Sequence, residues 1–250
     1  MFFLIGLGLN ENGYSKEASD AIMESDFVYI DVYTVDFPYQ IKKLESQFGR
    51  KSSKGSRFKE KKFIPVKREF VESFEILEKA EEKNVALLVY GSPLSATTHI
   101  SLIEEAKQKN IGCKIIHGAS ILDAVAESGL HLYKFGKITS MPKWQKNFMP
   151  ESFIDVAREN HSIKAHTLIL CDIGLSFKEA LEQLETSALN RGIVLGKILV
   201  CQSMGTKNKK ILYNEISKFK KARGIENPFC LIIPSELHFT EKEVLGDFNF

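Results

Sequence analysis

The sequence has no long apolar run, no marked excess of one charge and no closely spaced cysteines. Its apolar runs are far shorter than the roughly 18 residues of a transmembrane helix, so we expect none. The 34 basic residues nearly balance the 32 acidic ones, and a net charge of +2 does not indicate a nucleic-acid-binding protein. Residues 1–5 lack the basic start and the cleavage site of a signal peptide. They predict a buried first strand.

The cysteines and histidines give no sign of a metal site. Each of the four cysteines lies in or beside an apolar run, none belongs to a CxxC pair, and the histidines show no HxH or HExxH spacing. A reduced, cytoplasmic chain without a metal is therefore expected. The cysteines are Cys113, Cys171, Cys201 and Cys230.

Apolar runs alternate with segments of helical period, which predicts an α/β protein with mainly parallel strands. The expected strands are about 2–8, 27–33, 63–66, 85–90, 113–117, 166–172, 197–203 and 229–233. The expected helices are about 15–25, 38–48, 69–83, 97–109, 119–127, 150–160, 176–190, 208–222 and 240–246. With 250 residues, the chain can form two domains, each with its own core.

We place the domain boundary after His117, which gives domains of 1–117 and 118–250. Residues 137–150, with two prolines, predict a loop or an irregular strand pair. Ser176 with Glu179, and Thr240 with Glu243, have the spacing of capping boxes at helix starts.

A basic stretch at 50–62 holds seven cations and one acid. Such runs are usually exposed, mobile loops. The alternative is a docking patch for an acidic protein or for RNA.

Glycines follow the first and fourth expected strands. Gly91 and Pro93 form a tight turn after 85–89, at a strand end where open α/β sheets bind ligands. The GxG at 6–8 lacks a third glycine in register, because residue 11 is Glu and Gly13 is displaced. This disfavours a nicotinamide-binding Rossmann site.

Polar residues near strand ends are candidates for a ligand site, and Ser120 and His99 have two interpretations each. Ser120 either presents its hydroxyl to a ligand or caps the following helix, and local sequence favours the cap. His99 either acts as a general base or orders its turn by hydrogen bonding, and a lone histidine favours the second. Tyr33 is expected to face solvent at the end of its strand.

Taken together, segments along almost the whole chain resemble the diphthine synthase family, which belongs to the class III, tetrapyrrole-methylase-like S-adenosylmethionine-dependent methyltransferases. The ATTH at 96–99, the HGASI at 117–121 and the LYKFG at 132–136 carry the resemblance most specifically. The other matching segments are 4–9, 33–34, 68–72, 150–153, 166–173 and 231–238.

This resemblance implies a homodimer of two α/β domains, with the cofactor in a cleft between them. It also implies repeated methyl transfer to the amino group of the modified histidine of translation elongation factor 2, during diphthamide synthesis. Cofactor contacts, carried over by position, fall on Leu9, Ser92, Ser95, Ser120, Ile121, Cys171, Cys201 and Cys230. An α-amino group has an unperturbed pKa of about 7.7–8, so a dedicated base is optional and we assign no catalytic residue.

The chain departs from the family pattern at several positions. Ser92 stands where the family turn Gly-Asp-Pro has aspartate, Val35 stands where the family has serine, and 202–205 lacks a basic residue. The alternatives are a related methyltransferase that acts on a tetrapyrrole or an RNA, and a noncatalytic relative that binds a partner. A nicotinamide-dependent dehydrogenase is a more distant alternative.

Overall fold

The structure, a computed structural model, describes residues 1–49 and 61–250, and the chain divides into two compact units. The first unit is Met1–Ile121 and the second is Leu122–Phe250. The division falls four residues beyond the boundary that we expected after His117. Most of the basic stretch at 50–62 lies outside the described residues.

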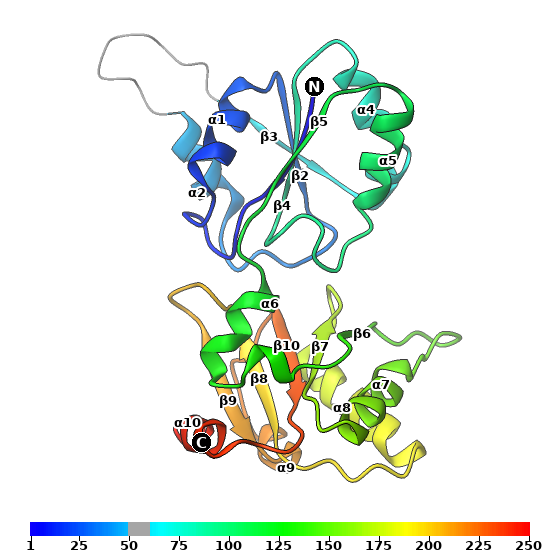
Figure 1. Cartoon of the computed structure of the whole chain (residues 1–250), viewed down its shortest axis with the longest axis vertical. Coiled ribbons are helices and arrows are strands. Elements are labelled where there is room, and N and C mark those ends of the chain that lie inside the picture. Colours follow the sequence, from blue (N-terminus) through cyan, green and yellow to red (C-terminus); the bar gives the residue numbers. More distant parts are fainter. Residues whose placement is uncertain (50–60) are drawn as a thin grey trace. The chain divides into compact units, whose positions relative to one another are not determined.

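The first unit is built on a five-stranded parallel sheet, in the order β3-β2-β4-β1-β5 (Figure 1). The central strands β1 and β4 are apolar along their whole length and buried at every position. Continuous apolar runs of this kind are typical of parallel strands that helices cover on both faces. The strands are β1 (Phe2–Gly6), β2 (Phe27–Asp31), β3 (Phe63–Val66), β4 (Val85–Val89) and β5 (Cys113–Ile116).

Helices cover both faces of this sheet. Residues of β1 alternate between two apolar cores, with Phe2 and Leu4 in one and Phe3 and Ile5 in the other. The first core includes side chains of α3, α4 and α5, whereas the second includes those of α1, α2 and η1. The helices are α1 (Lys16–Glu24), α2 (Ile41–Glu45), η1 (Ser46–Phe48), α3 (Arg68–Glu72), α4 (Glu75–Ala80) and α5 (Ile100–Gln108).

The helix expected at 69–83 is two helices. Phe74 separates α3 from α4 and has a left-handed backbone conformation, with a φ of 63°. A helix cannot pass through such a residue, because the left-handed region breaks the hydrogen-bond ladder. Periodicity alone did not show this break.

The second unit has its own five-stranded sheet, in the order β6-β7-β10-β8-β9. Only β6 and β7 pair in parallel, and the other three pairs are antiparallel. The expectation of mainly parallel strands is therefore confirmed for the first unit and wrong for the second. The strands are β6 (Thr139–Met141), β7 (Thr167–Cys171), β8 (Ile198–Gln202), β9 (Lys210–Asn214) and β10 (Phe229–Ile233).

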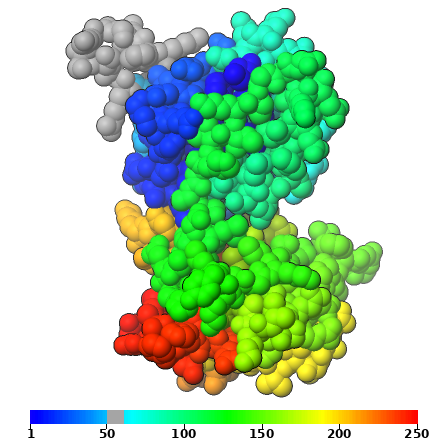
Figure 2. Space-filling model, viewed as in Figure 1, coloured from blue at the N-terminus to red at the C-terminus, as the bar shows by residue number. Residues whose placement is uncertain are grey.

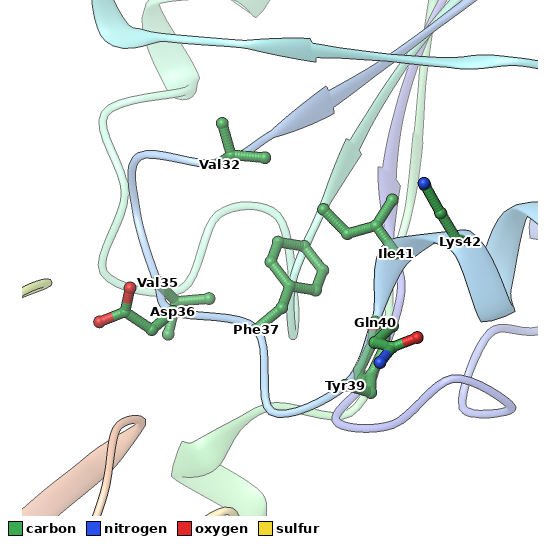
Figure 3. Close-up of a pocket in the computed structure, with 8 residues that line it drawn as sticks. All are labelled: Val32, Val35, Asp36, Phe37, Tyr39, Gln40, Ile41 and Lys42. Carbon is green, nitrogen blue, oxygen red and sulfur yellow. The ribbon is translucent and has the colours of Figure 1, made fainter.

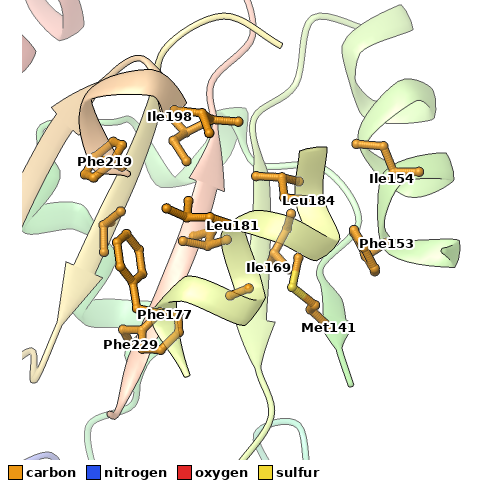
Figure 4. Packing of buried hydrophobic residues seen from close by; sticks show 14 of the residues in the cluster. Met141, Phe153, Ile154, Ile169, Phe177, Leu181, Leu184, Ile198, Phe219 and Phe229 are labelled. Carbon is orange, nitrogen blue, oxygen red and sulfur yellow. The ribbon is translucent and has the colours of Figure 1, made fainter. Parts of the chain in front are cut away.

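One core packs helices against this second sheet. Figure 4 shows Leu181 and Leu184 of α8 beside Ile169 of β7, with Phe177 next to Phe229 of β10. The Phe177 and Phe229 rings meet edge to face, with centroids 5.5 Å apart. The helices of the unit are α6 (Ile121–Ala124), η2 (Val125–Ser128), η3 (Leu132–Lys134), α7 (Ser152–Ser162), α8 (Phe177–Asn190), α9 (Ile216–Phe219) and α10 (Phe239–Gly246).

The helix expected at 208–222 is wrong in its first half. Residues 210–214 form β9, which pairs antiparallel with β8, and only 216–219 are helical. Three consecutive apolar residues, Ile211, Leu212 and Tyr213, lie in this strand, and pairing with β8 provides its backbone hydrogen bonds. The short β6 lies within 137–150, where we expected a loop or an irregular strand pair.

One of the two expected capping boxes is confirmed. Ser176 and Glu179 form the reciprocal hydrogen bonds at the start of α8. The box expected at Thr240 and Glu243 is wrong. Helix α10 is capped two residues earlier, by His238 together with Glu241.

The C-terminal helix α10 packs closely against the segment that follows α6. In Figure 2 the C-terminal residues (red) lie against this green segment. A Cβ on Gly129 of the segment would lie 2.4 Å from the Val244 side chain of α10.

Among the described residues, no helix combines the length and the apolar character that a membrane span requires.

Candidate functional site

The carboxyl ends of β1 and β4 touch through glycines. The Gly8 N–H donates to the Gly91 carbonyl at 3.1 Å, and the Gly91 N–H donates to the Gly8 carbonyl at 2.9 Å. A Cβ on Gly6 would lie 2.6 Å from the Gly91 oxygen and 2.8 Å from Cδ of Pro93. Real Cβ atoms do not approach backbone this closely, so the contact requires glycine at position 6.

The end of β5 joins the same contact. A Cβ on Gly118 would lie 2.6 Å from the Gly8 nitrogen and 2.7 Å from the Gly91 oxygen. Gly91 has a φ of +75°, and a Cβ on it would lie 3.9 Å from the Cα of Ser120. Three adjacent strands therefore end in loops whose backbones are in contact, and we call this contact the glycine junction (Gly6, Gly8, Gly91, Gly118).

The glycine junction gathers the site residues that we predicted in the first unit. Leu9 directly follows Gly8, Ser92 follows Gly91, and Ser120 lies two residues after Gly118. Leu9 and Ser120 are buried, whereas Ser92 is half-buried. Ser95 lies on the same turn as Ser92 and donates its N–H to the Ser92 carbonyl at 3.1 Å. Ile121 is the first residue of α6.

The three predicted cysteines lie in the second unit. Cys201 of β8 and Cys230 of β10 are directly paired across the sheet, and Cys171 ends β7, the other neighbour of β10. A hydrogen bond with Cys201 and burial raise the pKa of the Cys230 thiol, and burial raises the pKa of Cys171. Both thiols are therefore protonated and unreactive at neutral pH. Their contact with a cofactor stays a prediction.

His99 orders the turn that carries Ser92 and Ser95. Its Nδ1 lies 3.2 Å from the Pro93 carbonyl oxygen, which can only accept, so Nδ1 carries a proton and donates. Its Nε2 lies 3.2 Å from both Asp31 Oδ2 and the Tyr33 hydroxyl. The expectation that His99 orders its turn by hydrogen bonding is confirmed, because both ring nitrogens are engaged and the side chain is 1% exposed.

Asp31, at the end of β2, is the partner of His99 and is fully buried. Its carboxylate also accepts from the N–H groups of Tyr33 and Thr34 and from the Thr34 hydroxyl. Burial, together with the charge of Asp31, raises the pKa of Tyr33 to about 12, so the phenol stays a donor. The expectation that Tyr33 faces solvent is wrong, since its hydroxyl contacts His99. Sequence analysis did not single out Asp31. The signal that could have indicated it is a lone acid at the end of an apolar strand.

A cavity of about 570 Å³ lies beyond the end of β2 (Figure 3). Its lining combines apolar and aromatic side chains with one acid, one base and one amide. Sequence analysis did not single out this cavity, because its lining lies in a loop without a recognisable motif. The lining residues are Val32, Val35, Asp36, Phe37, Tyr39, Gln40, Ile41 and Lys42.

Within residues 1–49 and 61–250, no group of three or more histidine, cysteine, aspartate or glutamate side chains is placed to hold a metal ion.

Comparison with known proteins shows the family to which the chain belongs. The family profile of Tetrapyrrole (Corrin/Porphyrin) Methylases matches residues 1–219. The diphthine synthase of Thermoplasma acidophilum is 32% identical over 258 aligned positions, which cover 100% of this chain and 96% of that protein. The chain belongs to the diphthine synthase family of tetrapyrrole methylases. It is a methyltransferase, and the resemblance inferred from its motifs is confirmed.

Other members of the family extend the comparison. The diphthine methyl ester synthase of Schizosaccharomyces pombe is 39% identical over 176 aligned positions, which cover 69% of this chain and 58% of that protein. A crystal structure of a diphthine synthase superposes with a TM-score of 0.86 at 29% identity, and covers 99% of this chain and 95% of that one. The two-unit α/β architecture is therefore that of the family.

Replacing Gly6 by alanine tests the glycine junction. The new Cβ would overlap the Gly91 carbonyl and the Gly118 N–H, so we expect the free energy of unfolding to fall by about 1–3 kcal/mol, the usual cost of overpacking. Urea denaturation followed by circular dichroism measures the change. Gly196→Ala is the control, because nothing lies within 4 Å of a Cβ there. Equal stability of the two variants would show that the strand ends can separate freely.

Replacing Asp31 by alanine tests the buried hydrogen bonds of its carboxylate. The variant leaves two N–H groups and a hydroxyl without their acceptor and removes the contact with His99, so we expect a loss of about 3–5 kcal/mol in the free energy of unfolding. Asp20→Ala is the control, because it removes only an exposed ion pair with Lys16 and is expected to cost less than about 1 kcal/mol. Similar losses in both variants, by urea denaturation, would contradict the role of Asp31.

Proposed function

We propose that the protein transfers methyl groups from S-adenosylmethionine to the amino group of the modified histidine of translation elongation factor 2, in diphthamide synthesis. The observation that carries this proposal is the match to a diphthine synthase over the whole chain. The glycine junction supports it, because a ligand site at the carboxyl ends of parallel strands is the usual arrangement in open α/β sheets.

The residues around the glycine junction fit this cofactor in chemistry. Ser92, Ser95 and Ser120 bring hydroxyl groups that suit the ribose and amino-acid parts of S-adenosylmethionine. Leu9 and Ile121 bring apolar side chains that suit the adenine ring. Because none of these five residues is charged, they hold the cofactor through neutral hydrogen bonds and apolar contact.

The sulfonium of the cofactor supplies an already activated methyl group, so the protein mainly has to bind, orient and exclude water. The bonds of His99 to Pro93 and Asp31 fix the turn that carries Ser92. The double hydrogen bond between Gly8 and Gly91 fixes Leu9 relative to that turn. A target amine with a pKa of about 7.7–8 has a useful neutral fraction near pH 7 without a dedicated base.

A second product is favoured by a specific observation. Two fungal relatives named diphthine methyl ester synthase, from Schizosaccharomyces pombe and Saccharomyces cerevisiae, are both 39% identical to this chain over 69% of its length. The archaeal diphthine synthases are 30–33% identical over longer alignments. Methylation of the carboxylate of the same side chain, in addition to its amine, is therefore the second candidate.

The two products differ in chemical stability. We expect purified protein, incubated with S-adenosylmethionine and elongation factor 2 bearing the unmethylated intermediate, to add the mass of one or more methyl groups. Methyl esters are hydrolysed by mild alkali and N-methyl groups are not, so mass spectrometry before and after alkali separates the products. Elongation factor 2 that lacks the modified histidine is the control. No added mass on the intermediate would overturn the proposal.

Ser92→Asp tests the binding site of the cofactor. An aspartate at this position, as in the family turn, accepts hydrogen bonds with full charge, which is worth about 1 kcal/mol more than a neutral acceptor. We expect S-adenosylmethionine to bind about fivefold more tightly by isothermal titration calorimetry. Asn110→Asp is the control, since it adds the same charge at an exposed position before the amino end of β5. Equal affinities of Ser92→Asp and wild type for S-adenosylmethionine would show that Ser92 does not contact the cofactor.

The finer expectations stay predictions. Elongation factor 2 as the protein partner, the homodimer and the cytoplasmic location follow from the resemblance to the family.

A further inference from the structure

Three aromatic rings pack together between the end of β4 and the loop after β2. The ring centroids of Phe37 and Tyr39 are 5.4 Å apart, those of Phe37 and Tyr90 are 5.5 Å apart, and those of Tyr39 and Tyr90 are 6.3 Å apart. Phe37 meets both tyrosines edge to face. Each ring is therefore held in a fixed orientation by the other two.

Two of these rings also line the cavity beyond β2, which we call the aromatic pocket. In Figure 3, Phe37 and Ile41 point toward one another, and Asp36 and Lys42 lie on opposite sides of them. The pocket of about 570 Å³ thus combines aromatic and aliphatic surface with one charge of each sign. A ligand that fits this lining has a cationic, methyl-rich part and an anionic part.

The hydroxyl oxygen of Tyr39 is buried and has no hydrogen-bond partner among the described residues. Burial raises its pKa above the usual range, so it remains a neutral hydroxyl. A buried polar group that lacks a partner is costly and rare, and a bound ligand is one explanation for it. This observation is independent of the shape and the charges of the pocket.

The aromatic pocket is also connected to the glycine junction. The Tyr90 hydroxyl donates to the Leu9 carbonyl at 3.1 Å, and Leu9 is one of the proposed cofactor contacts. β2 and β4 are neighbours in the sheet, so the loops after them lie at the same edge. A group held in the pocket therefore lies beside the proposed cofactor site of the first unit.

We propose that the aromatic pocket holds the methylated ammonium group of the acceptor side chain between successive methyl transfers. An amine that has gained three methyl groups is a quaternary ammonium without any N–H to donate a hydrogen bond, and its diffuse charge is best bound by aromatic faces. The acceptor end group carries a carboxylate beside its amine, and Lys42 supplies the opposite charge for it. This inference rests on the proposed function.

The first experiment measures binding without any methyl transfer. Glycine betaine is the probe, since it joins a trimethylammonium group to a carboxylate, and glycine is the comparison. We expect betaine, but not glycine, to shift the NMR methyl signals of Val35 and Ile41. We expect Phe37→Leu to weaken betaine binding at least fivefold and Phe37→Tyr, which keeps an aromatic face, to retain it. Absence of these shifts in the wild type, or equal binding by Phe37→Leu, overturns the inference.

Phe148→Leu is the matched control, because it removes an exposed aromatic ring in the second unit. It is expected to bind betaine as the wild type does. A fivefold loss in this variant as well would mean that the effect does not come from the pocket.

The second experiment follows the products of methyl transfer. We expect Phe37→Leu to release partly methylated elongation factor 2 from reactions in which the wild type completes methylation. If the wild type adds no methyl group, the proposed function fails, while the betaine experiment still tests the pocket. If the wild type methylates and Phe37→Leu gives the same distribution of products, the pocket inference fails and the proposed function stands.

The sulfonium of the cofactor is the other cation without N–H groups that such a pocket could bind. Calorimetry with S-adenosylmethionine and with S-adenosylhomocysteine, which lacks the charge, separates the two cases. We expect Phe37→Leu to leave the ratio of the two affinities unchanged. A fivefold or larger fall in this ratio would assign the pocket to the cofactor and overturn its assignment to the acceptor.

Discussion

The close contact of three strand ends is the constraint on which the first unit depends. Gly6 and Gly118 allow backbone atoms at the ends of β1, β4 and β5 to approach to distances that no Cβ would permit, and Gly8 and Gly91 have the positive φ that favours glycine. The contact determines where Leu9, Ser92 and Ser120 lie, because each is within two residues of one of these glycines. It also gives the β1 glycines a structural role that differs from dinucleotide binding. They bring the loops after three strands together.

The buried carboxylate of Asp31 adds a fourth strand end to this arrangement. Through His99 it connects the end of β2 to the turn after β4, and both side chains are almost completely buried. A buried charge is costly unless hydrogen bonds compensate it, and here two N–H groups and a hydroxyl donate to the carboxylate. Breaking such a buried hydrogen-bond network costs much free energy, so the turn that carries Ser92 is held in one conformation.

Sequence predicted the first unit better than the second, for a physical reason. Parallel strands buried on both faces are continuous apolar runs, and β1 and β4 were recognisable as such. β8 and β10 are equally apolar, so nothing in their composition showed that they pair antiparallel. β9 was not predicted, because its five residues include a lysine and an asparagine. Its backbone hydrogen bonds come from pairing with β8, which its own sequence pattern did not indicate. The strand-end site residues were predicted through motifs, which carry over by position, and they stay predictions.

The aromatic pocket could not be predicted from motifs, because it depends on the packing of residues that are distant in the sequence. Phe37 and Tyr90 are far apart in the sequence, and each is unremarkable by itself; the surface that they form exists only because β2 and β4 are neighbours. Tyr90 connects this surface to the glycine junction, since its ring packs against Phe37 and its hydroxyl donates to the Leu9 carbonyl. Repeated methylation requires an enzyme to bind an acceptor that becomes bulkier and more apolar at each step and permanently charged at the last one. Hydroxyl groups suit the first, uncharged amine, whereas aromatic faces suit the last, so a site that serves the whole series needs both kinds of surface side by side.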